Sequence, residues 1–332
     1  MAEIVAVDIG GTHARFAIAT LAGGKVVGLA LERTLKCADH DGLQAAWACY
    51  GSSIGRALPR GAAVAVACQV TGEMLKLTNN GWTIDRSRLP QQLGVDWTLI
   101  VNDFAAVAHA VAQADAAHLH PVCGPLTALP TAGVISVVGP GTGLGVALLD
   151  VAADGYRVLA SEGGHSGFAP ADATDAMLAV RLRERFGRVS AERVVSGPGL
   201  GNIHAVLSAD GGGGHGDADL WARAIAGDDP RVSSTLARFC RCFGSFCGDM
   251  ALAHGADAVV IAGSLANRLI DHPAMAQFAE GFADKGRFAP AMRRIPVKLA
   301  IHPHAGLFGA AAAFARDSAT PGRNPITAGD FH

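Results

Sequence analysis

The stretch that decides the fold is Ile4-Val5-Ala6-Val7-Asp8-Ile9-Gly10-Gly11-Thr12-His13-Ala14-Arg15, which continues into the apolar residues Phe16-Ala17-Ile18-Ala19. It predicts a strand, a tight turn at the glycines and a second strand. The pattern returns as Val134-Ile135-Ser136-Val137-Val138, the turn Gly139-Pro140-Gly141-Thr142-Gly143-Leu144-Gly145, and Val146-Ala147-Leu148-Leu149. Glycine permits sharp turns and close approach of a ligand, and backbone N–H groups with a threonine hydroxyl suit phosphate oxygens. We therefore expect the two turns to hold the phosphates of one nucleotide.

Neither turn matches the phosphate-binding loops that are commonest in proteins. A P-loop requires Gly, four residues and then Gly-Lys-Ser/Thr, but Val26 follows the Gly24-Lys25 pair. A dinucleotide fingerprint, G-x-G-x-x-G, opens a helix, whereas the second turn reads G-x-G-x-G-x-G and strand-like residues follow it. Ordinary hairpins with glycine in the turn are the alternative interpretation. A threonine in both turns, with Asp8 leading the first, favours phosphate binding.

Composition limits the classes of protein to which the chain can belong. With 332 residues, half of them hydrophobic, it can build a large core and two lobes. Aromatic residues make up 6% of the chain and the formal net charge is −2, so we expect neither nucleic acid nor a membrane as a partner. Seven scattered cysteines without a disulfide-like framework favour a reducing, cytoplasmic compartment. No apolar run reaches about 18 residues, so no transmembrane helix is expected.

Strands alternate with helices along the chain, which predicts an α/β fold with a mixed sheet. We expect a small lobe from residues 1–112 and 305–318, a large lobe from residues 113–304, and a loosely ordered tail at 319–332. Each lobe carries one glycine turn, which suggests two related lobes with the nucleotide in the cleft between them. Beyond the hairpins, the expected elements are helices at 41–57, 104–113 and 305–316, a mostly helical region at 172–290, and strands at 62–67, 97–101, 258–262 and 296–301.

Further motifs are distributed along the chain. In order, the motifs are Asp8-Ile-Gly-Gly-Thr-x-Ala-Arg, Leu77-Thr78-Asn79-Asn80-x-Trp82, Val101-Asn102-Asp103-Phe104, Gly139-x-Gly-Thr-Gly-Leu-Gly, Glu162-Gly-Gly-His165, Ser190-Ala-Glu192-Arg-Val-x-Ser-Gly-Pro-Gly and Asp284-Lys-Gly-Arg-Phe. From about residue 3 to 315, this set resembles the bacterial glucokinase family. The resemblance implies the two-lobed actin/hexokinase-like (ribonuclease H-like) α/β fold, with ATP, Mg²⁺ and the sugar in the interlobe cleft. It also implies phosphorylation of glucose on its 6-hydroxyl, and we expect a homodimer.

Asp103 is the candidate general base. Phosphoryl transfer requires positioning, charge neutralisation and a base for the attacking hydroxyl, and Asp103 follows a predicted strand. From the sequence alone, a helix N-cap before Phe104-Ala105-Ala106 is the favoured interpretation. The resemblance implies the catalytic role instead, and the two roles are compatible.

Polar residues elsewhere in the motifs suit a sugar, whose hydroxyls both donate and accept hydrogen bonds. The resemblance places Asn102, Asp103, Glu162, His165 and Glu192 at the positions that bind glucose. We expect Asn79 to line the same pocket. Taken alone, Glu192 suggests a solvated helical glutamate and His165 a loop histidine, whereas Gly163-Gly164 beside Glu162 permits close approach of a ligand.

The nucleotide is expected at the two turns. Thr12 and Thr142 would bond phosphate oxygens, assisted by N–H groups of the adjacent glycines. Asp8 is the predicted Mg²⁺ residue, directly or through water, although an aspartate that stabilises its turn is the alternative. Gly263 stands at the strand end where relatives bind adenosine. The expected nucleotide-binding set is Asp8, Gly10, Gly11, Thr12, Gly141, Thr142, Gly143 and Gly263.

Cys240, Cys242 and Cys247 invite a zinc interpretation, but no nearby CxxC or histidine pair completes a tetrahedral site. Buried free thiols are the favoured interpretation.

Two rival functions remain open at this point. One is a kinase for another hexose, such as mannose or fructose, or one with ADP or polyphosphate as donor. The other is a sugar-sensing regulator that binds its ligands without turnover. Such a regulator would lack Asp103 or a glycine turn, and both are present.

Overall fold

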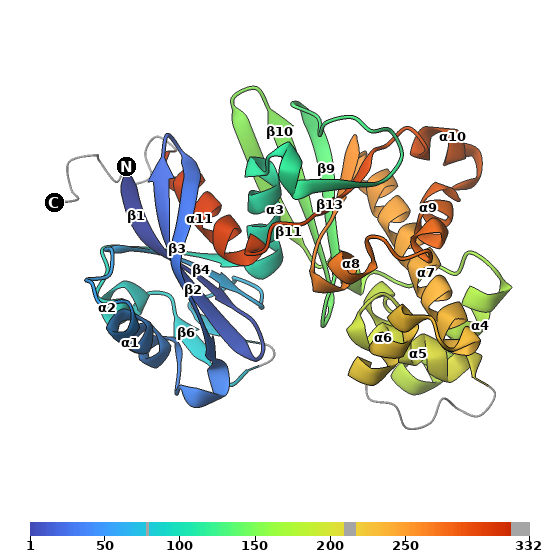
Figure 1. Ribbon diagram of the computed structural model, residues 1–332, viewed down its shortest axis with the longest axis horizontal. Helices are drawn as coiled ribbons and strands as arrows, with labels where there is room; N and C mark the ends of the chain where they lie inside the picture. The colour runs from blue at the N-terminus through green and yellow to red at the C-terminus, as the bar shows by residue number, and fades with distance from the viewer. Residues whose placement is uncertain (78–79, 209–216, 320–332) are drawn as a thin grey trace. The chain divides into compact units, whose positions relative to one another are not determined.

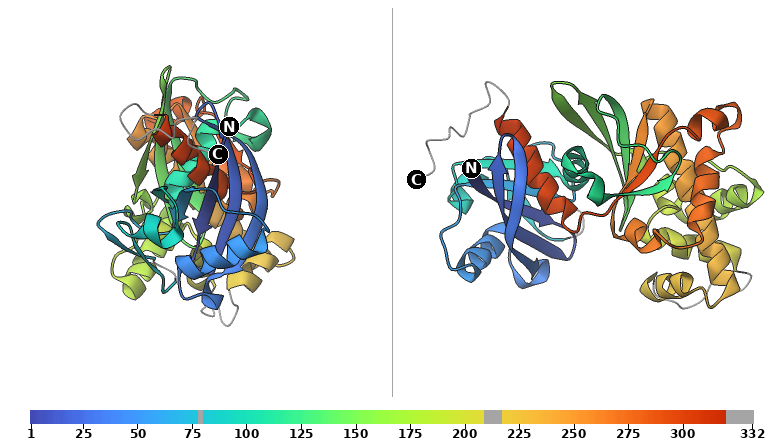
Figure 2. Two further views of the ribbon diagram at one scale, coloured as in Figure 1. Left: turned by 90° about the vertical axis from the view of Figure 1, so that its left-hand side faces the viewer. Right: turned by 45° about the horizontal axis from the view of Figure 1, so that its top comes forward.

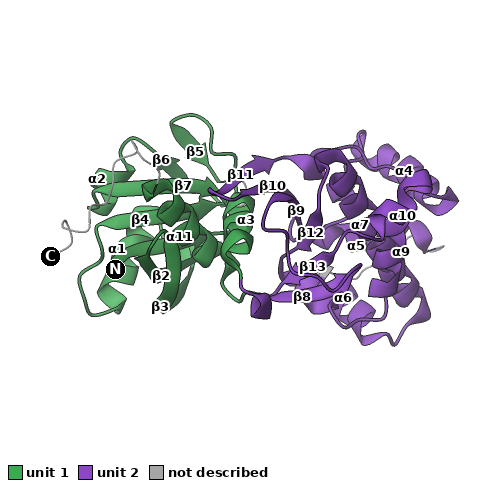
Figure 3. Cartoon of the chain, turned by 90° about the horizontal axis from the view of Figure 1, so that it is seen from above, with its two compact units in different colours: residues 1–114, 302–332 green, residues 115–301 purple. Residues whose placement is uncertain are grey.

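The computed structural model describes residues 1–77, 80–208 and 217–319. The chain divides into two compact units, coloured separately in Figure 3: unit 1 combines residues 1–114 with those from 302 onward, and unit 2 comprises residues 115–301. Each unit has its own sheet and its own core. The predicted sugar ligand Asn79 and the tail from residue 320 onward lie outside the described residues.

The sheet of unit 1 is mixed, with the strand order β3-β2-β1-β4-β7. The first three strands pair antiparallel, and β4 and β7 extend the sheet from β1 in parallel. The strands are β1 (Ala2–Ile9), β2 (His13–Ala22), β3 (Lys25–Lys36), β4 (Gly61–Val66) and β7 (Trp97–Asn102), beside a small hairpin of β5 (Met74–Lys76) and β6 (Thr83–Asp85). The helical segments are η1 (Cys37–Asp39), α1 (Leu43–Ser53), α2 (Leu89–Leu93), α3 (Asp103–Gln113) and α11 (Ala305–Ser318).

Both faces of this sheet are buried, because successive side chains of its central strands point to opposite faces. Val5 and Val7 of β1 pack in a cluster with α1, while Ala6 packs in a second cluster with α11, which lies along the sheet in Figure 1. Small residues bring α11 close to α3: a methyl group at Gly309 would overlap the carbonyl oxygen of Ala106. Close packing of this kind holds the ends of the strands in place, including the end of β1 near Asp8 and the end of β7 at Asn102.

Unit 2 repeats this sheet with one additional strand, in the order β11-β10-β9-β12-β13-β8. Its first three strands are antiparallel, β9, β12 and β13 are parallel, and β8 pairs antiparallel with β13. The strands are β8 (Leu119–Cys123), β9 (Gly133–Pro140), β10 (Leu144–Ala152), β11 (Gly155–Ser161), β12 (Ala258–Ile261) and β13 (Val297–Ala300). The two glycine turns therefore occupy equivalent places, between β1 and β2 and between β9 and β10. This duplicated α/β design confirms the expected fold class, and the right-hand view of Figure 2 shows a sheet with helices packed against it in each unit.

Helices pack around the sheet of unit 2. The longest, α7 (Pro230–His254), crosses α9 (Met275–Ala283) closely enough that a methyl group at Gly244 would overlap the carbonyl oxygen of Phe278. The other helical segments are η2 (Ala116–His118), η3 (Gly163–His165), α4 (Ala173–Phe186), η4 (Ala191–Arg193), α5 (Gly197–Leu207), α6 (Asp217–Ala226), α8 (Ser264–Leu269), η5 (Gly286–Phe288) and α10 (Ala289–Met292).

All seven cysteines are free thiols. Cys240, Cys242 and Cys247 are buried in α7, and burial raises the pKa of Cys240 to about 12. The prediction of buried thiols is confirmed. Across the described ranges, no helix combines the length and the apolar character needed to cross a membrane.

Candidate functional site

The first glycine turn connects β1 to β2 in unit 1. The strands pair as far as Ile9 and Ala14, and the N–H of Gly10 then donates to the carbonyl oxygen of His13 at 2.9 Å. This bond closes the turn, so the Gly10 N–H is engaged within the protein and Gly11 and Thr12 form the tip. Thr12 is exposed, and its hydroxyl lies 2.9 Å from Nδ1 of His13.

Two residues that the sequence argument did not select support this turn. The side-chain amide of Asn80 donates to the carbonyl oxygen of Gly10 at 3.0 Å, and the N–H of Cys37 donates to the carbonyl oxygen of Thr12 at 2.9 Å. Asn80 could have been selected from the sequence because it belongs to the second motif, Leu77-Thr78-Asn79-Asn80-x-Trp82. Cys37 belongs to none of the motifs, so nothing in the sequence indicated its role. A cavity of about 430 Å³ opens here, lined by Gly11, Thr12, His13, Lys36, Cys37, Ala38, Asn80, Gly81 and Trp82.

Asp8 lies in β1, one residue before the strand ends. Its Oδ2 accepts a hydrogen bond from Arg15 on β2 at 3.1 Å, and the two residues are paired across the hairpin. Burial raises the pKa of the Asp8 carboxyl, against the opposing charge of Arg15. A methyl group at Gly306, in the first turn of α11, would lie 2.5 Å from Oδ2 of Asp8. The carboxylate is thus seated against the N-terminal turn of α11, where the helix dipole favours negative charge.

Asn102 and Asp103 lie at the same edge of this sheet, at the carboxyl end of β7. The parallel register aligns Ile9 with Val66, and Val66 with Asn102. Asn102 is the N-cap of α3: its side-chain oxygen accepts from the N–H groups of Phe104 at 2.9 Å and Ala105 at 3.1 Å. The alternative in which Asp103 is the N-cap is therefore wrong. Asp103 is the first residue of the helix, partly exposed, with Oδ1 2.8 Å from the N–H of Phe104.

The second glycine turn connects β9 to β10 in unit 2 and is closed in a similar way. The N–H of Gly141 donates to the carbonyl oxygen of Gly143 at 2.8 Å, and Thr142 is exposed at the tip. The first residue of α5, Gly197, donates its N–H to the carbonyl oxygen of Gly141 at 2.7 Å. As at Gly10, the Gly141 N–H that we expected to face a phosphate is bonded inside the turn.

Gly263 lies beside this second turn. It follows β12 and has a φ of +102°, a region that residues with side chains rarely adopt. A methyl group there would lie 3.0 Å from the carbonyl oxygen of Pro140. The backbone angle favours glycine, and the close contact with Pro140 shows that the strand end expected to meet the nucleotide is adjacent to the turn expected to hold its phosphates.

The three predicted sugar residues of unit 2 lie together. Nε2 of His165 is 3.7 Å from Oε2 of Glu162, and its Nδ1 is 3.9 Å from Oε1 of Glu192. Glu162 and His165 are about half exposed, but the Glu192 side chain is only 26% exposed. Glu192 belongs to the short segment η4, and its Oε2 accepts from the N–H of Leu144 at 3.0 Å. The alternative of a solvated helical glutamate is therefore wrong for Glu192.

Glycines allow these segments to meet at the second turn. A methyl group at Gly164 would overlap the carbonyl oxygen of Leu144, and one at Gly143 would lie 2.5 Å from Oε2 of Glu192. Neither glycine is in the left-handed region. Their role is therefore to leave room, rather than to supply an unusual backbone conformation.

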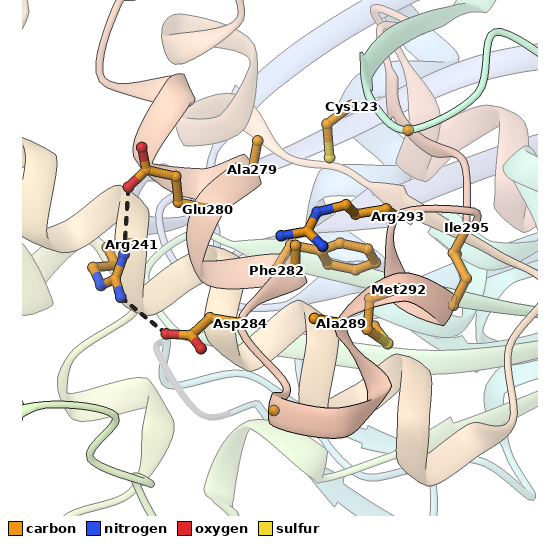
Figure 4. A pocket seen from close by; sticks show the side chains of 13 residues that line it. Cys123, Arg241, Ala279, Glu280, Phe282, Asp284, Ala289, Met292, Arg293 and Ile295 are labelled. Atoms are coloured by element: carbon orange, nitrogen blue, oxygen red, sulfur yellow. Dashed lines mark hydrogen bonds and ion pairs between the residues drawn. The ribbon is translucent and has the colours of Figure 1, made fainter.

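Unit 2 has a cavity of about 540 Å³, and none of the predicted sugar-binding or nucleotide-binding residues that the structure describes lines it (Figure 4). Arg241 lies at its edge, with ion pairs of 3.5 Å to Glu280 and 3.0 Å to Asp284. Cys123, Phe282 and Met292 are among its apolar lining residues. Arg241 is matched by carboxylates within the protein, a second arginine, Arg293, also lines the cavity, and we assign the cavity no part in the candidate site.

Comparisons with known proteins agree with these observations. A model of the glucokinase family matches residues 5–317. A glucokinase from Zymomonas mobilis is 50% identical over 316 residues, covering 94% of this chain and 98% of the relative. One from Xanthomonas oryzae is 40% identical over 321 residues, covering 93% and 94%. The crystal structure of a glucokinase from an Antarctic psychrotroph matches with a TM-score of 0.82 at 34% identity, covering 94% of this chain and 98% of that one. This chain therefore belongs to the glucokinase family.

Proposed function

We propose that this chain transfers the γ-phosphate of ATP to the 6-hydroxyl of glucose, giving glucose 6-phosphate and ADP. Membership of the glucokinase family over nearly the whole chain supports this reaction. The observation that carries it in the structure is the pair of exposed threonine tips, Thr12 and Thr142, at equivalent places in two sheets that share a five-stranded arrangement.

Asp103 is the proposed general base, which accepts the proton of the 6-hydroxyl as that oxygen attacks phosphorus. Its position supports the role in two ways. Asn102, not Asp103, is the N-cap of α3, and the Asp103 side chain lies in the first turn of the helix, partly exposed. Because it stands in the first turn of that helix, the dipole favours the ionised form that a base requires.

Glu162, His165 and Glu192 in unit 2, with Asn102 in unit 1, are the proposed glucose-binding side chains, and Asn79 completes the proposal. Carboxylates and an imidazole match the donor and acceptor capacity of sugar hydroxyls. Asn102 has only part of its hydrogen-bonding capacity available for glucose. Its oxygen caps α3, and one amide hydrogen is donated to the carbonyl oxygen of Cys68 at 3.2 Å. Among the described residues no acceptor is found for the second amide hydrogen, which could bond a sugar hydroxyl.

Thr12 and Thr142 are proposed to bond phosphate oxygens, with Gly11 and Gly143 as the neighbouring backbone donors. Gly10 and Gly141 act by closing the turns, and Gly263 borders the nucleotide. Mg²⁺ would enter with ATP, and Asp8 is the proposed residue for it. One partly buried carboxylate fits an ion that keeps several waters and binds substrate phosphates. When bound, the ion would neutralise charge on the β- and γ-phosphates.

The remaining parts of the proposal concern organisation. We propose that unit 1 is the small lobe and unit 2 the large lobe of the enzyme, that it acts in the cytoplasm, and that it forms a homodimer. The free state of all seven cysteines supports a reducing compartment. Light scattering of the purified chain would test the dimer, and a mass of one chain would contradict it.

A coupled assay for sugar 6-phosphate, with a panel of hexoses and phosphoryl donors, tests the reaction. We expect turnover with ATP and glucose, dependent on Mg²⁺. Turnover with mannose or fructose but not glucose would replace the substrate. Binding of glucose and ATP without turnover would instead indicate a sugar-sensing regulator.

Replacing either tip threonine with valine is predicted to impair use of the nucleotide. Thr12→Val and Thr142→Val remove one hydroxyl each while keeping the shape, so KM for ATP should rise or kcat should fall, by about tenfold for one lost bond to a charged group. KM for glucose should change little. Steady-state kinetics with each substrate varied in turn would check this. A change confined to glucose affinity would show that the turns do not hold phosphate.

A further inference from the structure

Glu192 connects the proposed sugar residues to the second glycine turn. Its Oε2 accepts a hydrogen bond from the N–H of Leu144, the first residue of β10 after the turn, at 3.0 Å. Its Oε1 is the oxygen nearer to His165, at 3.9 Å from Nδ1. The two oxygens of one carboxylate thus have different neighbours: backbone of the turn on one side and the imidazole of the sugar set on the other.

The backbone around Glu192 is fixed to the same place. The N–H of Ala191 donates to the carbonyl oxygen of Ser166 at 2.9 Å, which joins η4 to the end of η3. On the other side, Gly143 leaves the space that Oε2 occupies. Three chain segments, η3, η4 and the turn, therefore meet around Leu144 and Glu192.

We infer that Glu192 is a positioning residue for the nucleotide turn in addition to its contact with glucose, so that sugar binding tightens nucleotide binding. The inference rests on the proposed roles of the turn and of Glu192. An ionised carboxylate offers about four acceptor positions, so it can accept hydrogen bonds from the Leu144 N–H and from a sugar hydroxyl at the same time. A sugar that orders this side chain lowers the ordering cost for the nucleotide that binds next.

Glu162 provides a matched comparison, because the two glutamates share His165 as a neighbour. Glu162 lies 3.7 Å from Nε2 of His165, but its side chain is 53% exposed and no bond from it to the turn is found among the described residues. The two residues should therefore behave alike toward glucose and differently toward the nucleotide.

The experiment measures binding of Mg²⁺ with the non-hydrolysable analogue β,γ-imido-ATP by calorimetry, with and without glucose. For the unchanged chain, we expect glucose to tighten analogue binding, with the reciprocal effect of the analogue on glucose, by a factor of about 5 or more. Glu192→Ala should weaken analogue binding in the absence of glucose by about tenfold, the scale of one lost bond to a charged group. It should also abolish the coupling. Glu162→Ala should weaken glucose binding alone.

Two further variants keep the inference testable. Glu192→Gln retains an oxygen for the Leu144 N–H and should restore most of the analogue affinity. Glu192→Asp keeps the charge but is one methylene shorter, so it should resemble Glu192→Ala and replaces it if that variant does not fold. If Glu192→Ala or Glu192→Asp binds the analogue as well as Glu162→Ala does, the positioning role is wrong. If Thr142→Val also leaves analogue binding unchanged, the assignment of the turn to phosphate has failed instead.

Discussion

Replacing Asp103 with asparagine is expected to lower kcat by about 10²–10⁴-fold, the usual contribution of a general base. The amide keeps the size of the side chain and some hydrogen bonding, but it does not take a proton at neutral pH. Calorimetric affinity for glucose should be largely retained, because the sugar keeps its other proposed ligands. The loss should therefore appear in kcat rather than in binding.

The capping of α3 by Asn102 allows this test to separate a loss of activity from a loss of stability. Asn102 accepts from the N–H groups of Phe104 and Ala105, and an asparagine at 103 keeps an oxygen for the Phe104 N–H. Asp103→Asn therefore leaves the cap of α3 in place, and the melting temperature should hold. Asp115→Asn is the control: that aspartate also stands at a helix start, capping η2 in unit 2, and its side-chain oxygen accepts from the N–H of His118, which is not a proposed ligand. Its kcat should match that of the unchanged chain. A near-normal kcat for Asp103→Asn would leave that residue a structural part of the helix start only.

Much of the fold could be predicted because its strands are apolar and end in recognisable residues. Residues 135–138 are buried in β9 and residues 62–66 in β4, although the strand expected at 62–67 ends at Val66, and the glycine turns are where the pattern put them. Helix ends were less predictable: the helix expected at 41–57 is shorter, Leu43–Ser53, and begins after Gly42 without a side-chain cap. Such an end is fixed by packing, which a local pattern does not contain.

The residues of the candidate site could be predicted from the sequence, but the hydrogen bonds that they make within the protein could not. Asp103 follows a strand and precedes an apolar run, so the sequence offered it as the cap; whether that role falls to Asn102 depends on backbone angles. The hydrogen bond between Glu192 and Leu144 joins residues 48 positions apart, and that between Asn80 and Gly10 joins residues 70 apart. Contacts at that separation follow from the tertiary fold, so the residues could be proposed as sugar or phosphate ligands but their support of the turns could not.

Gly164→Ala is predicted to damage the sugar set although it adds only one methyl group. That methyl would overlap the carbonyl oxygen of Leu144, which belongs to the backbone of β10 and does not move aside as a flexible side chain would. The segment η3 should therefore shift away from β10, carrying Glu162 and His165 with it. We expect KM for glucose to rise about tenfold or more and the free energy of unfolding to fall by about 1–3 kcal/mol, the typical cost of overpacking.

The same loop supplies the control for this change. Gly167 lies three residues further on, outside the left-handed region, and a methyl group there would meet no atom within 4 Å. Gly167→Ala should therefore leave the free energy of unfolding within about 0.5 kcal/mol and KM for glucose near its normal value. Denaturant unfolding and glucose kinetics on the two variants make the comparison. Equal behaviour of Gly164→Ala and Gly167→Ala would mean that η3 does not depend on its contact with Leu144. The glucose residues of unit 2 would then have to be held in place by some other contact than the one at the second turn.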